Sequence, residues 1–235
     1  MLKIELSEKN PIRLLKSDAQ GKTDALRMGL VMARAGLGKT AILVQIALDS
    51  LLNDKQVIHV SIGQSLDKTK LWYDDMFKDI AKACNLENVN ETYMEIMRNR
   101  MIMTFNESDF SRARLEERLT DLIQQNVIKP SCIVVDGFDF AGADHQMLAD
   151  LREMMESLGV QGWFSATCHR DDERVSKAGV PAPCHEVDDL FDIIVLLKPI
   201  SGKECLSLNL LKAASGVSGK QLQLDPGSLM VRENC

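Results

Sequence analysis

A glycine-rich segment near the start of the chain carries residue types that can hold a phosphate group. Residues 33–40 read ARAGLGKT and fit the spacing GxxxxGK[ST], with Ala33 in place of the first glycine. Gly36 and Gly38 allow backbone N–H groups to turn toward an anion with no Cβ in the way. Lys39 would reach the β- and γ-phosphates of a nucleotide. The predicted contacts in this loop are Ala35, Gly36, Leu37, Gly38, Lys39, Thr40 and Ala41.

An aspartate much further along the chain can complete a magnesium site with this loop. Asp136 directly follows the apolar run 132–135, which is typical of a buried strand. In phosphate-binding folds such an aspartate holds the Mg²⁺ shell, together with the hydroxyl at the position of Thr40. The sequence therefore predicts that ATP and Mg²⁺ bind at Thr40 and Asp136. A glycine turn beside a solvated lysine is the simpler alternative.

Strands and helices must place these residues, and their patterns alternate along the chain. Strands are expected at 28–32, 57–61, 101–105, 132–135, 160–167 and 193–197. Helices are expected at 40–52, 67–84, 111–125 and 147–158. Residues 205–224 are expected to form a hairpin that turns at 215–219.

This alternation predicts an α/β fold with a mostly parallel central sheet, helices on both faces and a C-terminal antiparallel hairpin. The chain of 235 residues is long enough for one large domain of this kind. We expect residues 28–235 to form the nucleotide-binding domain and residues 1–27 to form an N-terminal arm.

Charge and hydropathy argue against nucleic acid and membrane as partners. The net charge of -6 provides no overall attraction to polyanions, and within 170–192 acidic residues outnumber basic ones. No apolar run reaches the roughly 18 residues of a membrane span, and the N-terminal segment is too polar for a secretory signal. We therefore expect a cytoplasmic protein.

The six cysteines suggest neither a metal site nor a disulfide framework. No pair has the CxxC spacing, and a chain of this size does not need disulfide bonds to fold. Two Cys-His dipeptides, at 168–169 and 184–185, lack the usual spacing of zinc ligands. Buried or strand-end cysteines and exposed histidines are expected instead.

Over about residues 25–231 the chain resembles the RecA/KaiC/DnaB-helicase branch of P-loop ATPases. The stretch LLKAASGVSGKQLQLDP at 210–226 is similar to the hairpin of replicative helicase motor domains, which carries a Lys-x-Arg pair. The stretch FSATCHRDDER at 164–174 is similar to their polar-sensor segment, which places Thr167 at the sensor position. Asp192 opens a strand, as an aspartate does in that branch. The resemblance implies a RecA-like fold, a catalytic Lys212 that reaches the nucleotide of a neighbouring subunit, and a homo-oligomer.

Two departures from that branch concern catalysis. The strand after the first helix there ends in a glutamate that activates water, whereas this chain has Gly63 and Gln64. Gln64 could orient a water molecule, but an amide cannot take its proton. The finger reads Lys212-Ala213-Ala214 and lacks the arginine. A general base contributes roughly 10²–10⁴-fold and an arginine finger roughly 10³–10⁵-fold, so slow hydrolysis is expected.

Several alternatives stay open. If the alignment slips by a few residues, Asp67 or Glu107 could be the base. The chain could instead be a nucleotide-sensing regulatory module without hydrolysis, acting on an unidentified protein partner, or a small-molecule kinase. RAGLGKT also resembles the loop of MinD/ParA-like ATPase switches, with Arg34 in place of their signature lysine.

Overall fold

The computed structural model describes residues 10–16, 27–213 and 219–232, and its centre is a single sheet. In chain order the strands are β1 (Met28–Ala33), β2 (Gln56–Ile62), β3 (Arg100–Phe105), β4 (Pro130–Asp136), β5 (Gln161–Thr167), β6 (Ile193–Pro199), β7 (Leu206–Lys212) and β8 (Gln221–Leu224). Their spatial order is β3-β2-β4-β5-β1-β6-β7-β8. The first six are parallel, and β7 and β8 are antiparallel additions.

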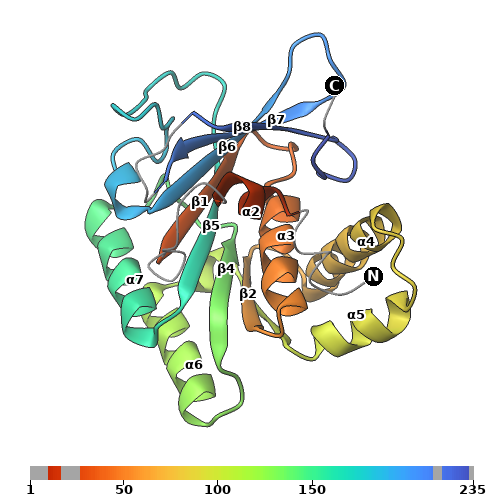
Figure 1. Cartoon of the computed structure of the whole chain (residues 1–235). Coiled ribbons are helices and arrows are strands. Elements are labelled where there is room, and N and C mark those ends of the chain that lie inside the picture. Colours follow the sequence, from red (N-terminus) through yellow and green to blue (C-terminus); the bar gives the residue numbers. More distant parts are fainter. Residues whose placement is uncertain (1–9, 17–26, 214–218, 233–235) are drawn as a thin grey trace.

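Helices cover both faces of the sheet. They are α2 (Pro11–Lys16), α3 (Lys39–Leu52), α4 (Leu66–Ala83), α5 (Val89–Met97), α6 (Arg112–Gln124) and α7 (His145–Leu158), with short 3-10 turns η2 (Glu107–Asp109) and η3 (Asp188–Leu190). Figure 1 shows α3, α4 and α5 on one face and α6 and α7 on the other. The predicted α/β architecture is therefore confirmed.

The two faces of the sheet belong to two separate apolar clusters. Along β1, Val31 and Ala33 pack with α3, whereas Leu30 and Met32 pack on the side of α6 and α7. All six residues of β1 are buried, as expected for a parallel strand covered on both sides. Burial of α3 nearly all round explains why its sequence shows little amphipathic pattern. The centre of the sheet is thus a rigid base for the loops that follow β1, β2, β4 and β5.

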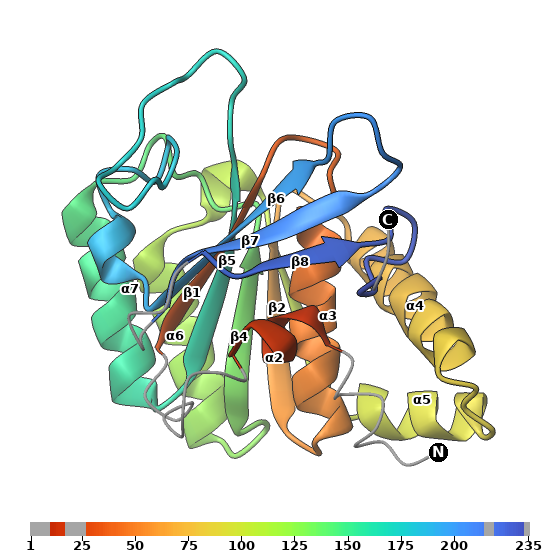
Figure 2. The same ribbon diagram turned by 45° about the horizontal axis from the view of Figure 1, so that its top comes forward.

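The C-terminal hairpin was expected, and β7 and β8 extend the sheet beyond β6 (Figure 2). Its predicted turn at 215–219 lies outside the described residues except for Gly219. One helix was not expected: α5 is short and follows a segment rich in asparagine and glutamate, which has no clear helical period.

The described part of the predicted N-terminal arm contacts α3. The side-chain amide of Asn10 donates to the carbonyl of Gln45 over 2.8 Å, Ile12 is buried, and Arg13 forms an ion pair with Asp49. Its boundary at residue 27 stays a prediction.

Four cysteines, at 84, 132, 168 and 184, are free thiols, as expected. Cys205 is disulfide-bonded, so the expectation that no disulfide forms is wrong at that position.

Candidate functional site

The segment between β1 and α3 has the conformation that an anion site requires. Gly38 precedes α3 with φ 99°, a left-handed conformation that strongly favours glycine. No side chain caps the first turn of α3. In contrast, Ser65, Ser111 and Asp144 cap α4, α6 and α7 through hydrogen bonds. The N–H groups of the first turn of α3 are therefore available to a phosphate.

A turn from the chain's C-terminal region packs against this loop. A Cβ on Gly38 would lie 2.8 Å from the Cδ1 of Leu229, so glycine is required here for space as well as for backbone angle. The amide of Gln45, on α3, donates to the carbonyls of Ser228 and Leu229 over 3.2 and 3.3 Å. The sequence contained no signal for this contact, because it joins residues far apart in the chain.

The predicted magnesium residues lie next to each other. The hydroxyl of Thr40 donates to Asp136 Oδ2 over 2.6 Å, and the hydroxyl of Ser165 donates to Asp136 Oδ1 over 2.5 Å. Asp136 is buried at the end of β4. Hydroxyl and carboxylate oxygens suit Mg²⁺, which is usually bound through one or two protein ligands together with phosphates and water. The donor set at Thr40 and Asp136 therefore fits a nucleotide-bound Mg²⁺.

No group of three or more acidic, histidine or cysteine side chains able to hold a metal ion occurs among the described residues. A metal cage made by the protein alone is thus not found in that part of the chain. This agrees with a site at which substrate phosphates supply part of the coordination.

Lys39 is half-buried beside this site. Burial lowers the pKa of Lys39 from its ordinary value, and the nearby carboxylate of Asp136 acts in the opposite direction. An ammonium group with reduced access to water interacts more strongly with an incoming polyphosphate than a fully solvated one.

A cavity of about 700 Å³ joins the loop to the ends of neighbouring strands. Its floor is at the carboxyl end of the parallel strands, where α/β folds commonly bind ligands. The polar lining residues are Lys39, Thr40, Gln64, Glu107, Ser111, Arg112, Asp136, Asp139, Ser165, Thr167 and His169. The apolar lining residues include Ile62, Phe110, Phe138, Phe140, Met147 and Pro183.

Most residues predicted from the sequence meet at this cavity. Gln64 and Thr167 line it together with the loop residues Lys39 and Thr40. The remaining loop positions stand beside it: Ala35 and Gly36 are exposed, Leu37 and Gly38 are partly buried, and Ala41 is buried in α3.

Two predicted features do not lie at the cavity. The Lys212 ammonium donates to the backbone carbonyls of Asp188 and Asp189 over 2.8 and 3.2 Å, and Lys212 is not a lining residue. Ala214, where an arginine was expected, lies outside the described residues. Arg34, the position of the MinD/ParA signature lysine, is exposed.

The two alternative bases are separated by the structure. The carboxylate of Asp67 is 91% exposed and lies within 4.0 Å of Lys70 on α4, outside the cavity. Glu107 lines the cavity. Ser165 and His169 were missed by the sequence analysis. The only available signal for Ser165 was its position two residues before Thr167, on the same face of β5.

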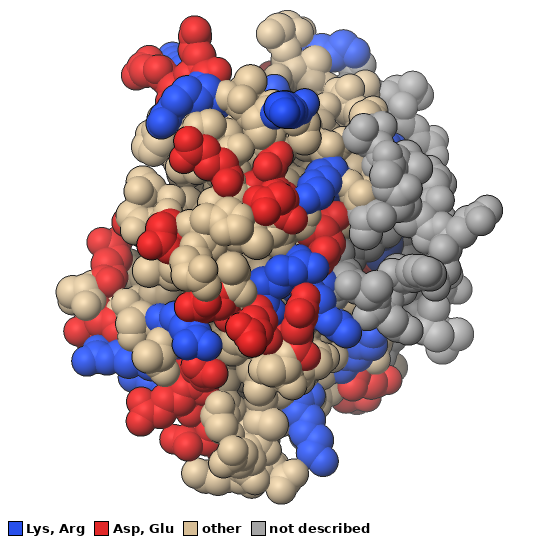
Figure 3. Space-filling view, turned by 90° about the vertical axis from the view of Figure 1, so that its left-hand side faces the viewer, with Lys and Arg blue, Asp and Glu red and all other residues tan. Residues whose placement is uncertain are grey.

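The segment between β5 and β6 is a compact structure with an acidic surface. Val180, Ala182 and Cys184 are buried, and the hydroxyl of Ser176 donates to Asp188 over 2.6 Å. Asp192 accepts from the backbone N–H groups of Arg27 and Met28 and pairs with Arg152. On the face shown in Figure 3, acidic and basic side chains are interspersed and no continuous basic stripe is visible.

No helix in the described ranges has both the length and the apolar character that crossing a membrane would need.

Comparison with known proteins supports the fold and leaves the family open. No protein-family model matches the chain, and no curated protein matches it. Solved structures do match, in 326 chains. One is the ATPase domain of a DnaB-like helicase, with a TM-score of 0.67 and 17% sequence identity over 98% of this chain and 94% of that one. The chain thus has the RecA-like α/β fold of P-loop ATPases, a fold class that does not by itself define an activity.

Proposed function

We propose that the protein binds ATP with Mg²⁺ at the loop 33–40 and hydrolyses it slowly, as a P-loop ATPase of the RecA/KaiC type. The observation that carries this proposal is the contact between Thr40 and Asp136, 2.6 Å long, beside Lys39 at the uncapped start of α3. A glycine turn with a solvated lysine would not require a buried aspartate from another strand at this position.

Each residue has a separate role in the proposed binding. The free N–H groups of α3 and the ammonium of Lys39 hold the phosphates. Thr40 and Asp136 hold the magnesium ion, which would neutralise the charge that develops on the phosphates. Ser165 keeps the Asp136 carboxylate in place through its short hydrogen bond. Thr167, at the end of β5, lines the cavity where a polar sensor would contact the terminal phosphate.

Two features support slow rather than fast turnover. Position 63 has no side chain to supply a carboxylate, and Gln64 is an amide. Lys212 is held within its own chain by two backbone carbonyls, so it must leave them before it can reach a neighbouring subunit. Without an arginine finger, roughly 10³–10⁵-fold of rate enhancement is missing.

A steady-state phosphate-release assay tests this proposal. Wild-type protein with Mg-ATP should release phosphate slowly but above the Lys39→Ala blank. The same assay with single-stranded DNA and at several protein concentrations tests for stimulation by a polymer or by a homo-oligomer. Binding of ATP with no release under any condition would contradict the ATPase and favour the nucleotide-sensing module that acts on a protein partner.

A further inference from the structure

The end of β2 and the turn after β3 meet at the cavity, at Gly63 and Glu107. The backbone N–H of Gly63 donates to the carbonyl of Phe105 over 2.9 Å, which ties the two strand ends together. Gly63 has φ 72°, and a Cβ built on it would lie 2.6 Å from Glu107 Oε1 and 3.0 Å from Glu107 Cγ. The side chain of Glu107 therefore occupies the space that any side chain at position 63 would need.

Glu107 differs from the other carboxylates that line the cavity. Asp136 is engaged with Thr40 and Ser165. One oxygen of Asp139 accepts from the backbone N–H groups of Ala141 and Gly142, so this residue forms a local turn. Within the described ranges of the chain, Glu107 has no hydrogen bond or ion pair. Its carboxylate is thus free to accept a proton.

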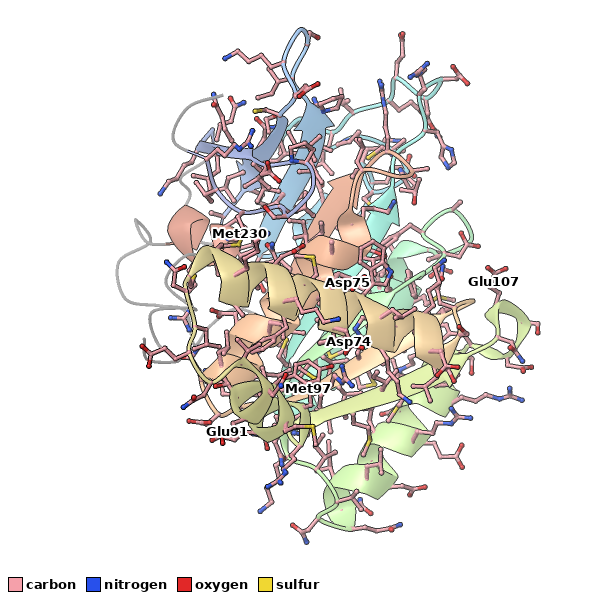
Figure 4. The ribbon with its side chains drawn as sticks, turned by 90° about the vertical axis from the view of Figure 1, so that its right-hand side faces the viewer. Asp74, Asp75, Glu91, Met97, Glu107 and Met230 are labelled. Carbon is pink, nitrogen blue, oxygen red and sulfur yellow. The ribbon has the colours of Figure 1, made fainter. Side chains whose placement is uncertain are left out.

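Figure 4 shows Glu107 at the end of β3, apart from Asp74 and Asp75 on α4 and Glu91 on α5. Glu107 is therefore not part of the acidic outer surface formed by those two helices. It belongs to the cavity that also contains Lys39 and Thr40.

We propose that Glu107 is the catalytic base of this ATPase, and that it supplies from β3 the carboxylate that β2 lacks at Gly63. The inference rests on the proposed function. In the step, a bond forms between the water oxygen and the γ-phosphorus while the bond from that phosphorus to the bridging oxygen breaks. ADP leaves with the electron pair of that bond. The water proton passes to Glu107, which later returns it to solvent.

Gln64 has a complementary role in this arrangement. It lines the same cavity and its amide can orient water, but it cannot accept the proton. Gln64 is therefore a positioning residue, and Glu107 is the group whose protonation state matters for the rate.

Single-turnover hydrolysis by wild type and Glu107→Gln is the test. The variant is nearly isosteric and removes the proton acceptor, so hydrolysis should slow by at least roughly 10²-fold. The rise in melting temperature on adding Mg-ATP should be unchanged, and quenched samples should contain bound, uncleaved ATP. Glu117→Gln makes the same charge change on the exposed side of α6 and should behave as wild type.

Two further variants distinguish a catalytic role from a structural one. Glu107→Asp keeps a carboxylate and should retain more activity than Glu107→Gln, although its side chain is shorter. Gly63→Ala should displace Glu107 and slow hydrolysis in wild type. It should add little in the Glu107→Gln background, because the two changes act on one group.

The outcomes separate this inference from the proposed function. If wild type hydrolyses ATP and Glu107→Gln stays within threefold of it, Glu107 is not the base although the protein is an ATPase. If wild type binds Mg-ATP without turnover above the Lys39→Ala blank, the ATPase and its base are both wrong and only binding stands. If wild type does not bind Mg-ATP, the proposed function itself fails.

Discussion

The hydroxyl of Thr40 donates a hydrogen bond to the carboxylate of Asp136, and this contact joins residues 96 positions apart in the sequence. It places the first turn of α3 against the end of β4, with Lys39 beside both. The magnesium site is thus assembled before any ligand binds, which reduces the ordering needed on binding.

The first prediction concerns this contact. Asp136→Asn should remove most of the difference in melting temperature between Mg-ATP and ATP with EDTA, because the carboxylate that favours the cation is lost. Ser165→Ala removes one hydrogen bond to the same carboxylate. It should lower the free energy of unfolding by about 1 kcal/mol and leave the magnesium effect in place. An unchanged magnesium effect in Asp136→Asn would place the ion elsewhere.

The second prediction concerns Gln64. Gln64→Glu adds a proton acceptor at the cavity with little change in volume, so single-turnover hydrolysis should be faster than in wild type. The gain should be larger in the Glu107→Gln background, where no other carboxylate competes. Rapid wild-type turnover that is unaffected by Gln64→Ala would show that Gln64 has no part in placing the water.

The third prediction is a pH dependence of stability caused by His59. This residue is buried in β2, with Nδ1 3.0 Å from the hydroxyl of Tyr73, and burial lowers its pKa to about 4 from an ordinary value of 6.5. The unfolded chain therefore takes up this proton at a higher pH than the folded protein. Stability should fall as the pH drops from about 6.5 toward 4, by about 2 kcal/mol at pH 5.

Urea unfolding at pH 7 and pH 5 measures this effect. His59→Gln should lose less stability between the two pH values than wild type does. His145→Gln changes an exposed histidine and is the matched control. Equal losses in wild type and His59→Gln would assign the acid sensitivity to other groups.

The fourth prediction is that single-stranded DNA binds weakly or not at all. Asp171, Glu173, Glu186 and Asp189 are exposed on the segment between β5 and β6, where repulsion of phosphates is expected. Any binding should disappear near physiological salt in a fluorescence-anisotropy titration. Submicromolar affinity under those conditions would reveal a basic surface that the described residues do not show.

Local patterns were sufficient to predict most of the fold. Alternating buried strands and helices indicated the parallel sheet, and all six parallel strands lie within a few residues of their expected positions. The helix α5 was missed because a nine-residue helix carries too few turns to show a clear period. The disulfide at Cys205 was missed because spacing alone does not reveal pairing between distant cysteines.

The candidate site was only partly predictable. The loop and Asp136 belong to a recognisable pattern, so their meeting could be expected. Ser165 and Glu107 reach the cavity through strand order and register, and the neighbouring positions of β2 and β3 are a property of the whole sheet. Sequence alone therefore left Asp67 and Glu107 as equal alternatives, and the sheet separates them.

The most direct test of the central claim is thermal unfolding with and without Mg-ATP. A ligand at 100 times its dissociation constant stabilises the folded state by about 2.7 kcal/mol. For a chain of this size that corresponds to a rise in melting temperature of roughly 5–10 °C. Wild type and Lys78→Ala, an exposed lysine on α4, should show this rise, and Lys39→Ala should not. No rise in wild type at millimolar Mg-ATP, or an equal rise in Lys39→Ala, would contradict nucleotide binding at the loop 33–40.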